Sequence, residues 1–61
     1  MNVTIDSQIT NINTSSFFYG CLGVVTEIKS VRNRTFFTIT YISGANVYKN
    51  IRCSSEYIVS V

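Results

Sequence analysis

The 61 residues predict one small all-β domain, an antiparallel barrel whose sheet bends sharply. Two observations carry this prediction. From Leu22 onward, apolar residues recur with the period of two that is typical of half-buried strands. The segment 35–42 consists only of β-branched and aromatic residues, which favour strands over helices. Because a chain of this length holds at most one domain, we expect a single barrel over residues 1–61.

The N-terminal third is the least regular part of the pattern. We expect a short strand over residues 3–5, followed by an irregular arm that runs to Phe18. An alternative for part of this arm is a helix of one to two turns near residues 6–12, because isoleucines recur there at helical spacing. Many Thr, Asn and Ser residues in the same segment oppose a helix.

Two strands joined by a basic turn form the predicted central hairpin. In the first strand, one face holds Leu22, Val24, Thr26 and Ile28, and the other holds Gly23, Val25, Glu27 and Lys29. The turn occupies 29–34, where Asn33 is the residue best suited to a left-handed conformation. In the second strand, 35–42, one face holds Phe37, Ile39 and Tyr41, and the other holds Phe36, Thr38, Thr40 and Ile42.

Residues 43–61 predict a turn, a strand, a helical turn and a last strand. Gly44 marks a turn over 43–46, because glycine supplies the backbone angles that such turns require. The next strand is expected over 47–53, with inward Val47, Ile51 and Cys53 and outward Tyr48, Asn50 and Arg52. Residues 54–56 predict a single helical turn with Ser54 as its cap. A short last strand over 58–61 completes the barrel.

Composition and charge narrow the classes of function. With 46% hydrophobic residues, the chain is too apolar to be disordered, and some apolar surface is left for a partner or a homodimer. A net charge of +2 permits nucleic-acid binding without requiring it. The sequence has no apolar run long enough for a transmembrane helix and no secretory signal pattern, so we expect a cytoplasmic protein without a membrane partner.

The sequence offers little for catalysis or metal binding. It has no histidine, no nucleophile beside a base, and only Asp6, Glu27 and Glu56 as carboxylates. We therefore expect no enzyme activity and no cofactor. Cys21 and Cys53 lack the paired spacing of a zinc site, and we expect them to be reduced thiols within the core.

Short strands, a long first loop and a helical turn before the last strand follow the plan of an SH3-like barrel. Within that class, residues 18–61 resemble the KOW module of transcription elongation factors and ribosomal proteins. The shared pattern is an aromatic residue, two spaced glycines, a valine and an isoleucine, here Phe18, Gly20, Gly23, Val25 and Ile28. The layout is also similar to that of the peripheral barrel subunit of photosystem I. The resemblance implies an SH3-like five-stranded antiparallel barrel that contacts nucleic acid or the transcription or translation machinery.

The first candidate site is the basic turn with the aromatic residue beside it. Phosphate oxygens favour such charges and an exposed ring can stack on a base. Its residues are Lys29, Arg32, Arg34 and Phe36, joined by Lys49 and Arg52 if the next hairpin lies alongside. The alternative interpretation is a solvated hairpin tip, kept polar to discourage edge pairing.

The second candidate site is aromatic. Tyrosines are enriched at protein interfaces, and Tyr48 and Tyr57 are expected at the surface, whereas Phe18 and Tyr41 are expected in the core. Gly20, Gly23 and Gly44 are interpreted as structural, serving curvature and turns. This pattern favours the alternative function, a docking module for a single protein partner: a small subunit of a larger assembly, or a phage-type inhibitor of a host protein.

Overall fold

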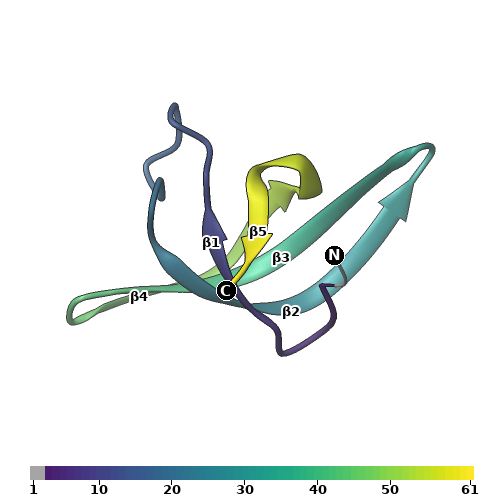
Figure 1. Cartoon of the computed structure of the whole chain (residues 1–61). Coiled ribbons are helices and arrows are strands. Elements are labelled where there is room, and N and C mark those ends of the chain that lie inside the picture. Colours follow the sequence, from purple (N-terminus) through teal and green to yellow (C-terminus); the bar gives the residue numbers. More distant parts are fainter. Residues whose placement is uncertain (1–2) are drawn as a thin grey trace.

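The strands form one continuous antiparallel sheet in the order β4-β3-β2-β1-β5 (Figure 1). The computed structural model describes residues 3–61, and within them the chain is all-β apart from one 3₁₀ turn. The elements are β1 (Gln8–Asn11), β2 (Leu22–Val31), β3 (Arg34–Ser43), β4 (Asn46–Ser54), η1 (Ser55–Tyr57) and β5 (Ile58–Ser60). The turn η1 leads from one edge strand directly to the other. The predicted fold class, five antiparallel strands with a helical turn before the last, is confirmed.

The strands β2 and β3 form a hairpin that is longer than the rest of the sheet. They pair along their whole length, from Leu22 opposite Ile42 to Val31 opposite Arg34. The short β1 pairs with β2 only over 22–24. Figure 1 shows the far end of the hairpin extending beyond β1 and β5. The molecule is correspondingly elongated, 35 × 23 × 20 Å.

The first strand lies later in the chain than the sequence predicts. The expected strand over 3–5 is wrong, because a turn closes there: the Ser7 backbone N–H donates to the Thr4 carbonyl, and Asp6 has a φ of 73°. The alternative helix near 6–12 is also wrong, since that segment holds β1. Only Ile9 of the spaced isoleucines is buried, where it pairs with Gly23.

A β-bulge in β2 reverses the predicted faces of this strand. The register with β3 shifts between Val25 and Glu27, so Thr26 is an extra residue. A bulge of this kind interrupts the alternation of side chains between the two faces. Ile28 therefore lies beside Phe37 on the inner side of the sheet, and Lys29 lies beside Phe36 on the outer side. The strict alternation expected over 22–29 is wrong beyond Val25.

A second bulge has the same effect in β4. The register with β3 shifts between Ile39 and Tyr41, and Asn50 has a φ of 60°. Beyond the bulge, Tyr48 turns inward and packs against the core while Val47 is exposed. The predictions of an inward Val47 and a surface Tyr48 are therefore wrong, although Ile51 and Cys53 do pack against the core as expected.

Both hairpin turns are tight. The turn between β2 and β3 contains only residues 32–33, and the left-handed residue is Arg32, with a φ of 52°, rather than Asn33. The predicted turn over 29–34 is therefore mostly strand. Gly44 has a φ of 60° in the other turn, as its predicted role requires.

The predicted cap of the helical turn η1 is wrong. Ser54 does not cap η1 with its side chain; its hydroxyl donates to Glu56 instead.

The core lies inside the curve of the sheet. It consists of Ile9, Val25, Phe37, Ile39, Tyr41 and Ile58, which are all buried. Phe18 stacks on Tyr41 with ring centroids 4.5 Å apart, which confirms the predicted core position of both rings. Gly23 lets two strands approach closely, because a Cβ there would lie 2.6 Å from Cγ2 of Ile39.

Nothing among residues 3–61 forms a helix long and apolar enough to span a membrane.

Candidate nucleic-acid interface

Phe36 is the centre of a cationic surface on the outer side of the β2–β3 hairpin. In the sheet register, Lys29 lies opposite Phe36 on β2, and Arg52 lies opposite Thr38 on β4. The Cζ atom of Arg52 lies 4.6 Å from the centroid of the Phe36 ring, and that of Arg34 lies 5.8 Å away. Arg32 occupies the turn beyond them. We call this set the cationic surface: Lys29, Arg32, Arg34, Phe36 and Arg52.

The cationic surface contains a shallow depression of about 350 Å³. Its lining residues are Glu27, Lys29, Phe36, Thr38, Asn50 and Arg52. The β2 bulge contributes to this arrangement, since it brings Lys29 to the same side as Phe36. Lys49 lies in the β4 bulge and is not among these residues, so the structure does not bring this candidate into the depression.

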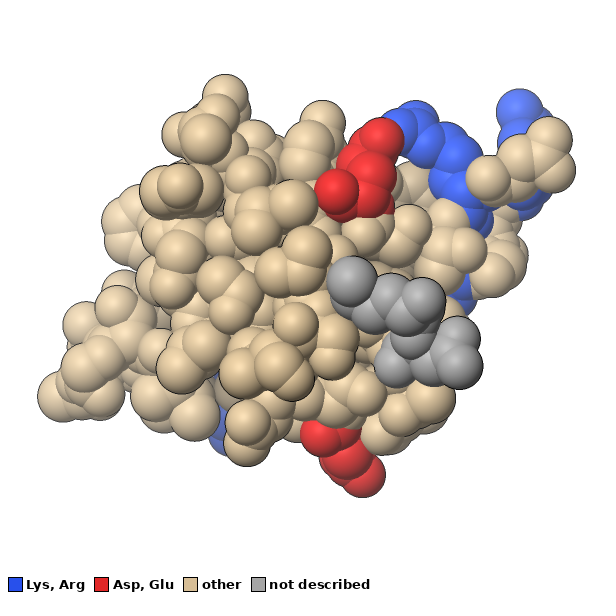
Figure 2. Space-filling model, in the orientation of Figure 1, with Lys and Arg blue, Asp and Glu red and all other residues tan. Residues whose placement is uncertain are grey.

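Two carboxylates moderate the positive charge. Nη2 of Arg34 lies 3.4 Å from Oε1 of Glu56, and these side chains are 65% and 57% exposed. An exposed pair of this kind is weak and screened by salt, so Arg34 can exchange its partner readily. Glu27 lines the depression beside Lys29. Figure 2 shows that most of the Lys and Arg surface in this view lies over the free end of the β2–β3 hairpin.

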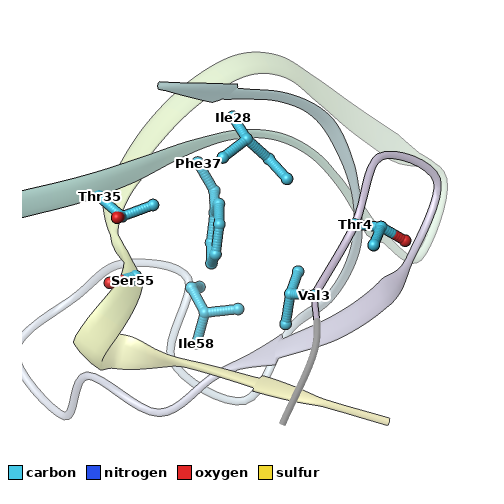
Figure 3. Close-up of a pocket in the computed structure, with 7 residues that line it drawn as sticks. All are labelled: Val3, Thr4, Ile28, Thr35, Phe37, Ser55 and Ile58. Carbon is cyan, nitrogen blue, oxygen red and sulfur yellow. The ribbon is translucent and has the colours of Figure 1, made fainter. Parts of the chain in front are cut away.

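A larger cleft lies on the inner side of the sheet, and its lining is mostly apolar. It measures about 620 Å³ and is lined by Val3, Thr4, Ile28, Thr35, Phe37, Ser55 and Ile58. Figure 3 shows the side chains of Val3, Ile28, Phe37 and Ile58 directed into it. These lining residues include three hydroxyl groups and no ionisable side chain. The cleft extends the apolar core and offers no group for acid–base chemistry.

The outer side of the sheet also holds an aliphatic row at the end opposite the cationic surface. Leu22, Ile42 and Val47 are direct cross-strand neighbours on β2, β3 and β4. They are 57%, 54% and 55% exposed. Tyr57, the other predicted interface residue, is exposed as expected, at 40%. The sequence prediction missed the aliphatic row because it placed Val47 inward.

A buried polar group was also missed by the sequence prediction. Asn11 is 2% exposed, and its Nδ2 donates to the Tyr41 hydroxyl at 3.0 Å. Its Oδ1 accepts from the Asn13 backbone N–H at 2.8 Å. Burial raises the pKa of the Tyr41 phenol, and burial also raises the pKa of the Cys53 thiol. The sequence does contain a signal for this burial. Asn11 follows Ile9 by two residues, so the two side chains lie on the same face of the strand.

The cysteines and carboxylates do not form a metal centre within the described part of the chain. Cys21 and Cys53 are free thiols that pack against the core. Residues 3–61 contain no cluster of three or more metal-binding side chains of the His, Cys, Asp and Glu types. The charged groups that the fold brings together around one ring are the cations beside Phe36.

No protein-family model, curated protein or solved structure matches this chain. The resemblance of residues 18–61 to KOW modules therefore rests on the sequence pattern alone.

Proposed function

We propose that this protein is a non-enzymatic binding module that contacts nucleic acid, alone or within the transcription or translation machinery, through its cationic surface. The observation that carries the proposal is the grouping of three of the five Lys and Arg residues around one aromatic ring, with a fourth, Arg32, in the adjoining turn. Phosphate oxygens take hydrogen bonds and charge from such side chains, and an aromatic ring adds contact with the bases. The KOW-like pattern of residues 18–61 points to the same class of partner.

The binding strength that this surface supports is moderate. Each neutralised phosphate contributes about 0.9 to the logarithmic salt dependence of duplex binding, and about 0.7 for a single strand. Four cations therefore give a slope of about −3 to −4 at most. We expect binding that is measurable at low salt and weak at physiological salt.

The test is a titration of a labelled oligonucleotide, followed by fluorescence anisotropy at several salt concentrations. The double variant Arg32→Ala, Arg34→Ala removes two cations from the cationic surface without changing a buried group. We expect its affinity to fall and its salt slope to become shallower by about 1.8 on a duplex or about 1.4 on a single strand. Binding that is unchanged in this variant contradicts the proposal.

A matched control is Lys49→Ala, which removes one positive charge outside the cationic surface. Its expected effect is smaller than that of Arg32→Ala or Arg34→Ala alone. An equal effect of all three single variants would mean that the net charge of the chain, rather than the cationic surface, drives binding. That result would also contradict the proposal.

The second candidate function is docking to a single protein partner. The exposed aliphatic row of Leu22, Ile42 and Val47 favours it, because contiguous exposed apolar side chains mark interaction surfaces. An affinity pull-down with and without nuclease treatment separates the two functions. A stoichiometric protein that survives nuclease and is lost with Ile42→Ser supports docking. Recovery that depends entirely on nucleic acid supports the first function.

A further inference from the structure

We propose that the nucleic acid bound by the cationic surface is single-stranded, and that one of its bases stacks on the pair formed by Phe36 and Arg52. This inference rests on the proposed function and names the class of its ligand. It is argued from the placement of the ring, the guanidinium groups and the depression beside them.

Phe36 and Arg52 are close enough for their planar groups to stack. The guanidinium carbon of Arg52 lies 4.6 Å from the Phe36 ring centroid, within the range of a cation–π contact. A guanidinium group is planar and stacks on aromatic faces, and so it can itself carry a base. The Arg52 residue is exposed, whereas Phe36 is half-buried beneath it and beside Arg34. The pair thus offers a flat, cationic platform on the sheet surface.

Cations and polar groups surround this platform. Lys29 lies opposite Phe36 on one neighbouring strand, and Arg34 lies on another side of the ring. These cations are placed to meet the phosphates that flank a stacked base. The depression is also lined by Thr38 and Asn50, whose hydroxyl and amide groups can bond to a base edge.

A stacking platform on a sheet surface needs a base whose face is accessible. In a duplex, both faces of a base are covered by its neighbours, so a platform on a sheet surface has nothing to stack on. The major groove admits a helix or a two-stranded ribbon, and the cationic end of the β2–β3 hairpin has that shape. The tip carries only Arg32 and Asn33 in its turn. The platform lies on the face of the sheet rather than at this tip.

The test compares single-stranded and duplex oligonucleotides of the same sequence, in DNA and RNA, each with one 2-aminopurine base. The variants are Phe36→Leu, which removes the aromatic ring, and Arg52→Lys, which keeps the charge and removes the planar group. We expect the wild-type protein to prefer the single strands and to quench 2-aminopurine fluorescence by stacking. Each variant should lose about tenfold in single-strand affinity and most of the quenching, with duplex binding nearly unchanged.

The controls separate folding, charge and stacking. Thermal unfolding followed by circular dichroism shows whether each variant is folded at the assay temperature. Because Arg52→Lys keeps its charge on an exposed strand position, it serves if Phe36→Leu proves unstable. Lys49→Ala should retain the quenching, since Lys49 lies outside the depression.

The failure of this inference is distinguishable from that of the proposed function. If the wild-type protein binds neither single strands nor duplex, both proposals are overturned. If it binds both equally, or if Arg52→Lys binds and quenches like the wild type, the stacking platform is refuted and the nucleic-acid function stands. Equal results for DNA and RNA agree with stacking, which does not depend on the sugar.

Discussion

The two faces of β3 differ in what surrounds the same kind of residue. Phe37 on the inner face is buried among aliphatic side chains, whereas its neighbour Phe36 on the outer face lies under the guanidinium group of Arg52. Ile39 is fully buried, while Ile42 on the outer face is more than half exposed. The strand is almost entirely β-branched and aromatic on both faces, so composition does not distinguish them.

This difference separates stability from binding. The inner face is covered by the side chains of the core. Substitutions on this face should therefore change the free energy of unfolding. No other element among the described residues covers the outer face. Substitutions on this face should therefore change binding and have little effect on the free energy of unfolding. A domain of about 60 residues is marginally stable, so inner-face losses should be large relative to the whole.

The largest expected effect is at Gly23 on the inner face. Replacement by alanine places a Cβ 2.6 Å from Cγ2 of Ile39 and 3.1 Å from the Thr40 carbonyl oxygen. Overpacking of this kind costs about 1–3 kcal/mol and occasionally more. Urea unfolding of Gly23→Ala should show at least this loss. The control is Gly44→Asn, a turn position with open space and a φ of 60° that asparagine tolerates.

If Gly23→Ala lowered the unfolding free energy by no more than Gly44→Asn does, the space between Gly23 and the Ile39 side chain would admit a methyl group. That result would contradict close packing of β2 against β3 on the inner face.

The second expected effect is at the buried amide of Asn11. Its Nδ2 donates to the Tyr41 hydroxyl, and removal of one partner from a buried hydrogen bond costs about 1–3 kcal/mol. Asn11→Ala should lower the unfolding free energy by this amount. Asn13→Ala is the matched control, because its own side chain makes only an exposed bond to the Ser15 backbone. Equal losses in both variants would contradict a special role for Asn11.

The sequence predicted the central strands well because their signals are local. Runs such as 35–42 contain only strand-forming residues, and the inward set of Phe37, Ile39 and Tyr41 follows from simple alternation. The position of β1 could not be predicted in the same way. It is fixed by pairing with Gly23 and with β5, and both partners are distant in the chain.

The candidate site was predicted in part for a related reason. Arg52 was expected to join the basic turn if the next hairpin lay alongside, and the structure brings it over Phe36. The bulges were not predictable, because a bulge arises from the register between two strands rather than from either strand alone. The β2 bulge brings Glu27 into the depression, and Lys49 is not among the residues that line it.

The third expected effect is a loss of stability at alkaline pH. Burial raises the pKa of Tyr41 above its ordinary value of 10.0, and burial raises the pKa of Cys53 above 9.0. The folded state therefore favours the neutral forms, and the stability that they contribute is present below these ordinary values. It is lost as the pH rises through the raised values. Urea unfolding between pH 7 and about pH 11 should show this decline.

The variant Tyr41→Phe removes one of the two titrating groups. Its overall stability should be lower, because Asn11 loses its partner, but its stability should fall less steeply with pH. Parallel pH profiles for the variant and the wild type would show that Tyr41 does not contribute to the alkaline decline.

The smallest expected effect on stability is at the exposed pair of Arg34 and Glu56. Glu56→Gln removes an ion pair that is mostly exposed, so the unfolding free energy should change by less than about 1 kcal/mol. The same substitution frees Arg34 and should tighten nucleic-acid binding, most clearly at low salt. Asp6→Asn raises the net charge equally without changing the cationic surface, and it should tighten binding less.

The central claim, that binding belongs to the outer cationic surface and not to the inner face, is tested most directly by nuclear magnetic resonance. Titration of isotope-labelled protein with a single-stranded oligonucleotide should shift backbone amide signals in residues 29–36 and 50–54. Signals of the row formed by Leu22, Ile42 and Val47 should remain in place. Shifts confined to that row, or to the residues that line the inner cleft, would contradict the account.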